Sequence, residues 1–246
     1  PIFLPVGGKP PDEYGENVVS KGKHMPWCEE PTLLEALNAL KPPDRSQDLP
    51  LRVPVERAYA GVSSREVIVC GRVETGVVAV RDEVVLQPIG ARGQVRFIKS
   101  RDERPPQFTQ MRWPELNQAA AGAIVSLGLR TEDEIPDPNA LRGDVLCKTK
   151  DSAEVAKKLK ARIYVLWHPT RILSGYSPVL YTGTAQTTCK FEDFFWKRGI
   201  ASSSREKNPQ YLVKGDMADV SLALADPLVV EERREVARLN RLIIRD

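Results

Sequence analysis

The segment 71–76, Gly-Arg-Val-Glu-Thr-Gly, has two glycines at the spacing found in phosphate-binding loops. Such a loop needs a lysine directly after its second glycine to reach the phosphates, but Val77 stands there. The sequence also contains no Asn-Lys-x-Asp motif for recognising guanine. Residues 71–76 are therefore predicted to form a turn between strands. The chain itself is predicted to have no catalytic site and no bound cofactor.

The histidines and cysteines do not suggest a metal site or a catalytic triad. His24 and His168 fall in segments assigned below to different domains, and His168, next to Pro169, is interpreted as a structural residue at a strand end. The four cysteines are far apart and include no Cys-x-x-Cys pair: Cys28, Cys70, Cys147 and Cys189. Four separate reduced thiols are favoured over a disulfide framework, which predicts a cytoplasmic protein.

Basic residues concentrate around one predicted strand and the segment that follows it: Arg92, Arg96, Lys99, Arg101, Arg104 and Arg112. Only Asp102 and Glu103 oppose them. Such a run is either a solvated face or a surface that contacts RNA phosphates, where basic side chains release condensed counterions. Both interpretations remain open at this point.

Four aromatic residues cluster at the end of another predicted strand: Phe191, Phe194, Phe195 and Trp196. Aromatic side chains can stack on nucleic-acid bases, but they also fill protein cores. Core packing is the favoured interpretation here, and base stacking is the alternative.

The composition is that of a folded soluble protein with more than one domain. With 246 residues, 41% hydrophobic and 28% charged, the chain can bury a core, and two domains are expected. Its 36 basic and 33 acidic residues give a net charge of only +3, so a polyanion surface would have to be local. No apolar run approaches the length of a membrane span, so no membrane contact is expected. Because the chain starts at Pro1 rather than methionine, it is interpreted as a fragment.

The predicted secondary structure changes from helix to strands near residue 42. Leucines at 33, 34, 37 and 40 predict a helix with one apolar face turned inward. Thr32 and Glu35 predict a capping box at its start. Pro42 and Pro43 end it, and residues 41–50 read as an extended linker. A domain boundary is therefore predicted there.

Beyond the linker the pattern is typical of short strands in an all-β sandwich or barrel. Strands are predicted at 51–55, 66–70, 83–86 and 94–98, and again at 161–167, 178–181 and 217–222. Long loops are predicted at 101–118 and 197–209, and the polar, lysine-rich segment 151–160 is placed at a second domain boundary. Residues 231–241 fit a short helix and an extended connection equally well.

Several motifs follow one another in a distinctive order. Met-Pro-Trp (25–27) precedes the leucine-rich helix and the two prolines, and Leu-Pro-Leu-Arg-Val-Pro-Val (49–55) precedes 71–76. Arg-Gly-Asp-Val (142–145), Gly-Tyr-Ser-Pro-Val-Leu (175–180) and Leu-Val-Lys-Gly-Asp (212–216) follow. In this order they resemble eukaryotic elongation factor 1-alpha, a family of translational GTPases that bind aminoacyl-tRNA. The resemblance covers nearly the whole chain.

The resemblance implies an all-β fold of two consecutive β-barrels after a short α-helical remnant of an α/β GTPase domain. Residues 1–47 would be that remnant with its linker, 48–152 the second-domain barrel, and 153–246 the third-domain barrel without its last strand. GTP and Mg²⁺ are expected for the full-length parent, a GTPase, and not for this fragment.

The resemblance also implies that the barrels contact RNA. The residues carried over are Gly71, Arg72, Glu74 and Gly76 in the second domain and Thr184, Lys214 and Gly215 in the third. Lys99 and Arg101, from the basic run, are added as candidate phosphate contacts. Aminoacyl-tRNA and the ribosome are the expected partners, with a nucleotide exchange factor as a further one.

Two departures from the family keep other functions open. Gly-Ala-Ile (122–124) replaces the family's Gly-Asp-Asn triplet, and the region 99–101 replaces a glutamate and a histidine that lie near the aminoacyl end of tRNA. The alternative is a release-factor or ribosome-rescue GTPase whose barrels bind a protein factor. A second alternative is a barrel scaffold without a ribosomal role.

Overall fold

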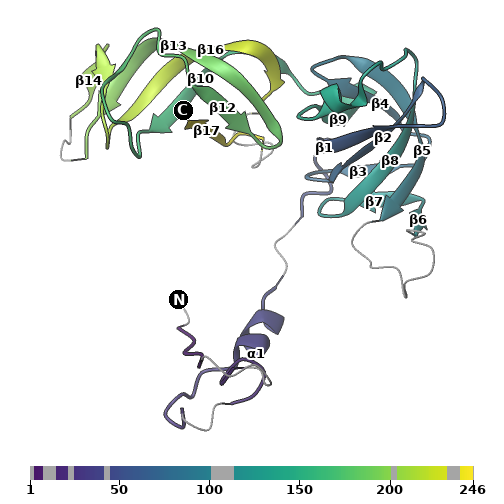
Figure 1. Cartoon of the computed structure of the whole chain (residues 1–246), viewed down its shortest axis with the longest axis horizontal. Coiled ribbons are helices and arrows are strands. Elements are labelled where there is room, and N and C mark those ends of the chain that lie inside the picture. Colours follow the sequence, from purple (N-terminus) through teal and green to yellow (C-terminus); the bar gives the residue numbers. More distant parts are fainter. Residues whose placement is uncertain are drawn as a thin grey trace. The chain divides into compact units, whose positions relative to one another are not determined.

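The computed structural model describes residues 3–7, 15–21, 25–41, 45–100, 114–200, 204–231 and 239–245. The chain divides into two compact units, Pro1–Asp44 and Arg45–Asp246 (Figure 1). The first unit contains the helix α1 (Leu33–Asn38), and all the strands belong to the second. The prediction of an all-β body preceded by a short helix is therefore confirmed.

The start of α1 is fixed by the predicted capping box. The Thr32 hydroxyl accepts a hydrogen bond from the Glu35 amide at 3.2 Å, and the Thr32 amide donates to the Glu35 carboxylate at 2.8 Å. These two bonds satisfy amides that have no partner inside the helix. The same contact with Thr32 lowers the pKa of the Glu35 carboxyl. The helix ends at Asn38, slightly before the predicted limit.

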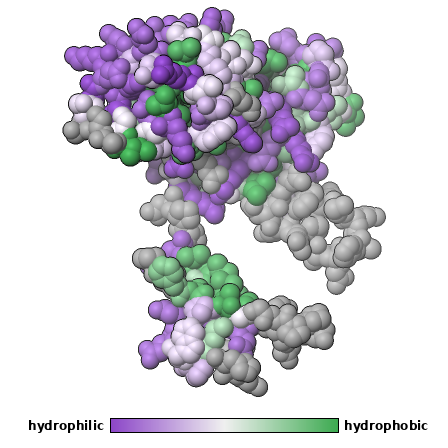
Figure 2. All heavy atoms as spheres, turned by 60° about the vertical axis from the view of Figure 1, so that its left-hand side comes forward, coloured by the Kyte–Doolittle hydropathy of each residue, from purple (hydrophilic) through white to green (hydrophobic). Residues whose placement is uncertain are grey.

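The prediction that the leucine face of α1 turns inward is wrong. No residue of α1 is buried, and Leu34, Leu37 and Leu40 are all exposed. Figure 2 shows the resulting apolar area on this unit. Within the described residues, the helix is held by backbone hydrogen bonds from Leu33 and Leu34 to the carbonyls of Asn17 and Val18. Helical spacing identified the face correctly, but the described part of this unit has no apolar cluster to cover it.

The first sheet of the second unit closes into a barrel. Its strands run in the order β4-β9-β1-β2-β8-β5-β6, and β4 also pairs with β5, so that six strands form a ring. The bounds of its strands are β1 Val53–Ala60, β2 Glu66–Arg72, β4 Glu83–Gln87, β5 Ala91–Ser100, β6 Glu115–Leu116, β8 Ile124–Thr131 and β9 Val145–Lys148. A two-stranded ribbon, β3 Val77–Ala79 with β7 Gln118–Ala120, accompanies it. Closure removes the unpaired edges that an open sheet would present.

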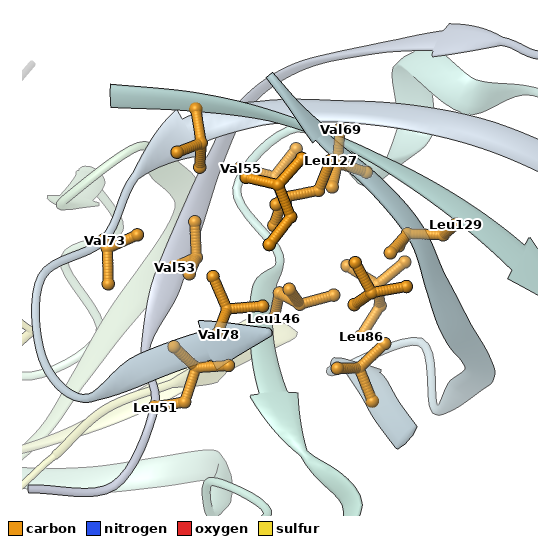
Figure 3. Packing of buried hydrophobic residues seen from close by; sticks show 14 of the residues in the cluster. Leu51, Val53, Val55, Val69, Val73, Val78, Leu86, Leu127, Leu129 and Leu146 are labelled. Carbon is orange, nitrogen blue, oxygen red and sulfur yellow. The ribbon is translucent and has the colours of Figure 1, made fainter. Parts of the chain in front are cut away.

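The inside of this barrel is filled by aliphatic side chains from every second residue of the strands. Figure 3 shows Val53, Val55, Val69, Leu127 and Leu146 converging on one another. All of them are at most 1% exposed. The alternation that predicted the strands is thus the pattern of inward-facing residues, as a half-buried antiparallel sheet requires.

The second sheet is open among the described residues. Its path is β10-β16-β13-β12-β17, and β14 pairs with β13. Its strands are β10 Val155–Tyr164, β12 Val179–Thr182, β13 Ala185–Arg198, β14 Glu206–Lys207, β16 Met217–Val229 and β17 Leu242–Arg245, next to a ribbon of β11 Ile172–Leu173 and β15 Tyr211–Leu212. No described ladder joins its end strands β10 and β17. Its own core contains Phe191, Leu180, Leu212 and Leu222.

Several predicted connections are strands instead. The lysine-rich segment 151–160 enters β10 at Val155, because its lysines alternate with Leu159 and other half-buried residues. Part of the loop predicted at 101–118 forms β6 and the start of β7, while 101–113 lies outside the described residues. The loop predicted at 197–209 contains the end of β13 and all of β14. Of 231–241, the segment 232–238 lies outside the described residues, so the choice between helix and extended chain stays open.

A shared apolar cluster and a buried ion pair join the two sheets. The cluster combines Val85, Val145 and Cys147 from the first sheet with Val229 and Leu239 from the second part of the chain. Beside it, the Arg52 Nε donates to Glu231 Oε1 at 2.5 Å, and Arg52 Nη1 donates to the Asp151 carbonyl at 2.7 Å.

Candidate nucleic-acid interface

The glycines of 71–76 have structural roles. Gly76 has φ of 75° and ends the connection from β2 to β3, and a Cβ there would lie 2.8 Å from the Leu51 backbone. Gly71 lies within β2 rather than in the turn, and a Cβ there would lie 2.2 Å from the Pro54 carbonyl oxygen. The Gly76 amide donates to the Ser46 carbonyl at 2.9 Å. The turn interpretation is confirmed for Gly76 and corrected for Gly71, where close strand packing requires glycine.

Arg72 and Lys99 lie on the same outer face of the first barrel. Arg72 on β2 is paired with Ile124 on β8, and Lys99 on β5 is paired with Ser126, two residues further along β8. Paired residues, and residues two apart on one strand, point to the same side of a sheet. The structure therefore places these two predicted basic residues on one face, on either side of β8.

Phe97 lies on the same face, two residues before Lys99 on β5. It is paired with Gly128 on β8 after a bulge in β5, and a Cβ on Gly128 would lie 2.1 Å from the Phe97 ring. The ring therefore rests on the glycine backbone, and the Lys99 ammonium lies 4.9 Å from its centre. We call Arg72, Phe97, Lys99, Ile124 and Ser126 the Lys99 face.

Phe97 and Gly128 were not identified from the sequence as candidate site residues. Neither has a local signal, because their contact depends on the register between β5 and β8 and on the bulge that separates Val95 from Phe97. A glycine in the middle of an otherwise apolar strand was the one available indication of a close approach.

The other predicted residues of this region are less informative. The Glu74 amide donates to the Arg52 carbonyl at 2.9 Å, which fixes its backbone at the barrel end. Arg92 and Arg96 are exposed on β5. Arg101, together with Arg104 and Arg112, lies outside the described residues.

The three predicted residues of the second sheet do not come together. Thr184 lies in the tight turn between β12 and β13, whereas Lys214 and Gly215 precede β16. Because Arg198, at the far end of β13, pairs with Met217, the two places are separated by the length of β13. At about 3.3 Å per residue, that is roughly 40 Å. Gly215 has φ of 89°, so the turn itself favours glycine.

The aromatic cluster divides into a buried pair, a half-buried Trp196 and an exposed Phe195. Phe191 and Phe194 are 1% and 7% exposed and belong to the core, as predicted. Two bulges in β13, after Phe191 and after Phe194, change which residues face out. Trp196 consequently pairs with Asp219, donates its Nε1 proton to that carboxylate at 2.8 Å, and lies beside the guanidinium groups of Arg162 and Arg205.

The remaining candidates for chemistry behave as structural residues. All four cysteines are unpaired, and three of them are buried. The His168 ring packs edge-on against Tyr176, with ring centres 5.2 Å apart. Within the described ranges, no group of His, Cys, Asp and Glu side chains could hold a metal ion. No described helix is long and apolar enough to cross a membrane.

The family described as GTP-eEF1A C-terminal domain-like matches residues 158–246. Elongation factor 1-alpha of Methanocaldococcus jannaschii is 36% identical over 233 residues, which cover 94% of this chain and 51% of that protein. The same factor from Aeropyrum pernix is 36% identical over 245 residues, covering 99% of this chain and 52% of that protein. The chain is homologous to elongation factor 1-alpha. It spans about half the length of the curated relatives that it matches.

Two solved structures share the fold of this elongation factor 1-alpha homologue. Sup35 complexed with GDP superposes with a TM-score of 0.70 at 24% identity, over 94% of this chain and 53% of that one. The elongation factor SelB from Methanococcus maripaludis gives a TM-score of 0.59 at 18% identity, over 81% and 41%. Identities this low establish the fold alone.

One departure from the elongation factor 1-alpha pattern falls on the Lys99 face. In Gly-Ala-Ile (122–124), where the resemblance leads one to expect Gly-Asp-Asn, the Ile124 side chain is 42% exposed next to Arg72. The turn before it is held by the Gly122 amide, which donates to the Val73 carbonyl at 2.6 Å, and by the Val73 amide, which donates to Ala123 at 2.9 Å. Backbone hydrogen bonds therefore hold this turn, and the Ile124 side chain adds an apolar surface to the Lys99 face.

Proposed function

We propose that this chain is the RNA- and ribosome-engaging part of a cytoplasmic translational GTPase of the elongation factor 1-alpha type. Its homology to that family supports a role in protein synthesis. The domains would be the linker region up to residue 47, a second-domain barrel over 48–152 and a third-domain barrel over 153–246. The full-length parent would bind GTP with Mg²⁺ and use the nucleotide to control binding of aminoacyl-tRNA.

The observation that carries this proposal is the Lys99 face. It combines two cationic side chains, Arg72 and Lys99, with an aromatic ring held against a glycine backbone. Cationic groups next to aromatic rings suit single-stranded nucleic acid, because the first contact phosphates and the second stack on bases. No described carboxylate forms an ion pair with Arg72 or Lys99, so their charge can act on phosphates. Glu115, paired with Lys99 across β6, is the nearest acidic residue in the register.

The test measures binding of tRNA and of its single-stranded acceptor end at two salt concentrations. Lys99→Ala and Arg72→Ala should each weaken binding and lower the dependence of log affinity on log salt by about 1, as loss of one phosphate contact predicts. Arg130→Ala, an exposed arginine at the other end of β8, is the matched control. Equal binding by all four proteins would exclude this face as the RNA site. Lys99→Ala/Arg101→Ala tests the wider basic run.

A second candidate is supported by Ile124. An exposed isoleucine beside Arg72 is better suited to a protein partner than to phosphates, so the same face fits a release-factor or ribosome-rescue GTPase. In that case tRNA affinity is absent even at low salt, and an acidic protein factor binds instead. Loss of that factor's binding in Ile124→Asp, with retained binding in Arg130→Ala, would identify this function.

GTP binding is expected to need the parent's GTPase domain. Calorimetric titration of the 246-residue chain with GTP and Mg²⁺ should show no binding, because 71–76 lacks the lysine that reaches phosphates. Micromolar affinity would contradict the proposed division of the parent protein.

A further inference from the structure

The outer face of the second sheet carries cations at regular intervals. Strands β10, β16 and β13 lie side by side in this sheet (Figure 1). On β10, Leu159, Ala161 and Ile163 pack against the core, so the residues between them point outward. Outward-pointing residues that pair across the strands form four rows: Lys158 with Ala223 and Lys190, Lys160 with Ser221, Arg162 with Asp219 and Trp196, and Tyr164 with Met217 and Arg198. Successive rows are two residues apart on β16, or roughly 7 Å.

Two cations of this face are neutralised by carboxylates of the same face. Lys158 Nζ lies 2.5 Å from Glu192 Oε2, and Arg162 Nε lies 2.7 Å from Asp219 Oδ1. Four further cations of the face are exposed, and none of them forms an ion pair with a carboxylate in the described part of the chain: Lys160, Lys190, Arg198 and Arg205. The face therefore has positive charge to spare.

Aromatic rings position two of these four cations. The Lys160 ammonium lies 4.1 Å from the centre of the Phe195 ring, and the Arg205 guanidinium lies 4.5 Å from the centre of the Trp196 ring. Arg205 thereby reaches the third row, to which Trp196 belongs. Each row then has one unpaired cation, in the order Lys190, Lys160, Arg205 and Arg198. We call these four cations, with Phe195 and Trp196, the Lys160 face.

We propose that the Lys160 face binds an extended acidic segment of a partner protein that carries a carboxylate at every second residue. In an extended chain, alternate side chains point the same way and lie roughly 7 Å apart. Four carboxylates at this spacing match the four rows, and each can accept charge-assisted hydrogen bonds from one cation. The residues between them can be neutral, so no further negative charge has to approach Glu192 and Asp219.

The same features favour a peptide over single-stranded nucleic acid. A nucleic acid carries a phosphate at every nucleotide and cannot leave out the charges that would meet Glu192 and Asp219. Its bases gain affinity by stacking on open aromatic rings, but cations already lie against Phe195 and Trp196. An acidic peptide needs no open ring. The inference goes beyond the proposed RNA function, because the Lys160 face and the Lys99 face belong to different sheets.

The experiment titrates the 246-residue chain into fluorescently labelled octamers at low salt and follows their anisotropy. The main probe is a peptide of four Glu-Ser repeats. Four Gln-Ser repeats remove the charge, four glutamates followed by four serines keep the charge but lose the alternation, and octauridylate represents nucleic acid.

Saturable binding of the alternating acidic peptide, with no binding of the Gln-Ser peptide, is the expected result. The peptide with grouped glutamates should bind about threefold more weakly, because it cannot meet all four rows and each exposed ion pair contributes up to about fivefold. Absence of saturable binding at low salt, equal affinity for the two acidic peptides, or octauridylate binding as tightly as the alternating peptide overturns the proposal.

Variants locate the site. Arg198→Ala and Arg205→Ala should each weaken binding of the alternating peptide about two- to fivefold, and the double variant about tenfold. Arg130→Ala removes an exposed arginine from β8 of the first barrel and should bind as the unchanged chain does. Circular dichroism checks that each variant is folded. If the folded double variant binds the peptide normally, the peptide binds elsewhere and the assignment is wrong.

Discussion

Charged side chains perform different tasks at the junction of the two sheets and on their outer faces. At the junction, Arg52 and Glu231 are 5% and 8% exposed and neutralise each other. On the outer face of the second sheet, Arg162 and Asp219 form a similar pair, but the Arg162 side chain is 61% exposed. Burial, rather than residue type, therefore decides whether a charge holds the structure together or stays available to a partner.

The two outer faces differ in a further way. On the second sheet, Arg162 donates two hydrogen bonds to the Asp219 carboxylate, which lowers the pKa of that carboxyl group, and both Arg162 and Arg205 lie against Trp196. On the Lys99 face, Lys99 contacts a ring, and neither Lys99 nor Arg72 forms an ion pair with a described carboxylate. Two faces with similar composition thus differ in how much of their positive charge a polyanion can reach.

The largest effect is expected at the junction. Arg52→Ala leaves the Glu231 carboxylate buried without its partner, which should cost about 3–5 kcal/mol of unfolding free energy. Urea denaturation measures this cost. The double variant Arg52→Met/Glu231→Leu should recover much of it, because neither charge remains buried. A single variant as stable as the unchanged chain would show that the pair contributes nothing to the junction.

The next effect is the contribution of Asp144 to the pH dependence of the unfolding free energy. Burial raises the pKa of its carboxyl group from 3.8 to about 7, so the folded state keeps a proton that the unfolded chain releases. Stability from this group is complete below about pH 4 and is lost as pH rises through about 7. Asp144→Asn should remove about 1–2 kcal/mol of that loss. Parallel pH profiles for the two proteins would contradict the pKa assignment.

Local signals in the sequence predicted the local structure well. Thr32 and Glu35 gave the start of α1 because a capping box involves only neighbouring residues. The alternating residues of β2 predicted a strand because one side of that strand faces the barrel core. The leucines of α1 correctly predicted the helix, but the prediction that they are buried was wrong, since burial depends on which other segments pack against the helix.

Residues that depend on register could not be predicted in the same way. The two bulges that turn Trp196 outward, and the bulge that places Phe97 on Gly128, exist only in the pairing with β16 and β8. Arg72 was named through the family resemblance and Lys99 through the concentration of basic residues, and their common face beside β8 was not predicted. The burial of Asp144 has no local sequence signal, because it depends on how segments distant in the sequence pack around it.

A smaller effect tests how the Lys99 face is built. Gly128→Ala places a methyl group where the Phe97 ring now rests, which should cost about 1 kcal/mol and displace Lys99 from the ring. RNA affinity should decrease with it. In Phe97→Ala/Gly128→Ala the methyl group has room, so the two substitutions should not add in a double-mutant cycle measured by urea denaturation. Additive costs would mean that the ring and the glycine are independent.

The smallest effect tests whether the Asp219 carboxylate lowers the RNA affinity of the outer face of the second sheet. Asp219→Asn keeps an acceptor for Trp196 Nε1 but removes the negative charge between Arg162 and the ring. Arg162 would then become available to phosphates, as Arg72 and Lys99 are on the Lys99 face. We expect tRNA affinity to rise about twofold at low salt and the gain to disappear at high salt, because it comes from counterion release. Anisotropy titrations with labelled tRNA at both salt concentrations measure it, with Asp193→Asn, which removes an exposed carboxylate on β13, as the control. An equal gain in both variants would reflect net charge alone, and the proposed difference between the two faces would then be wrong.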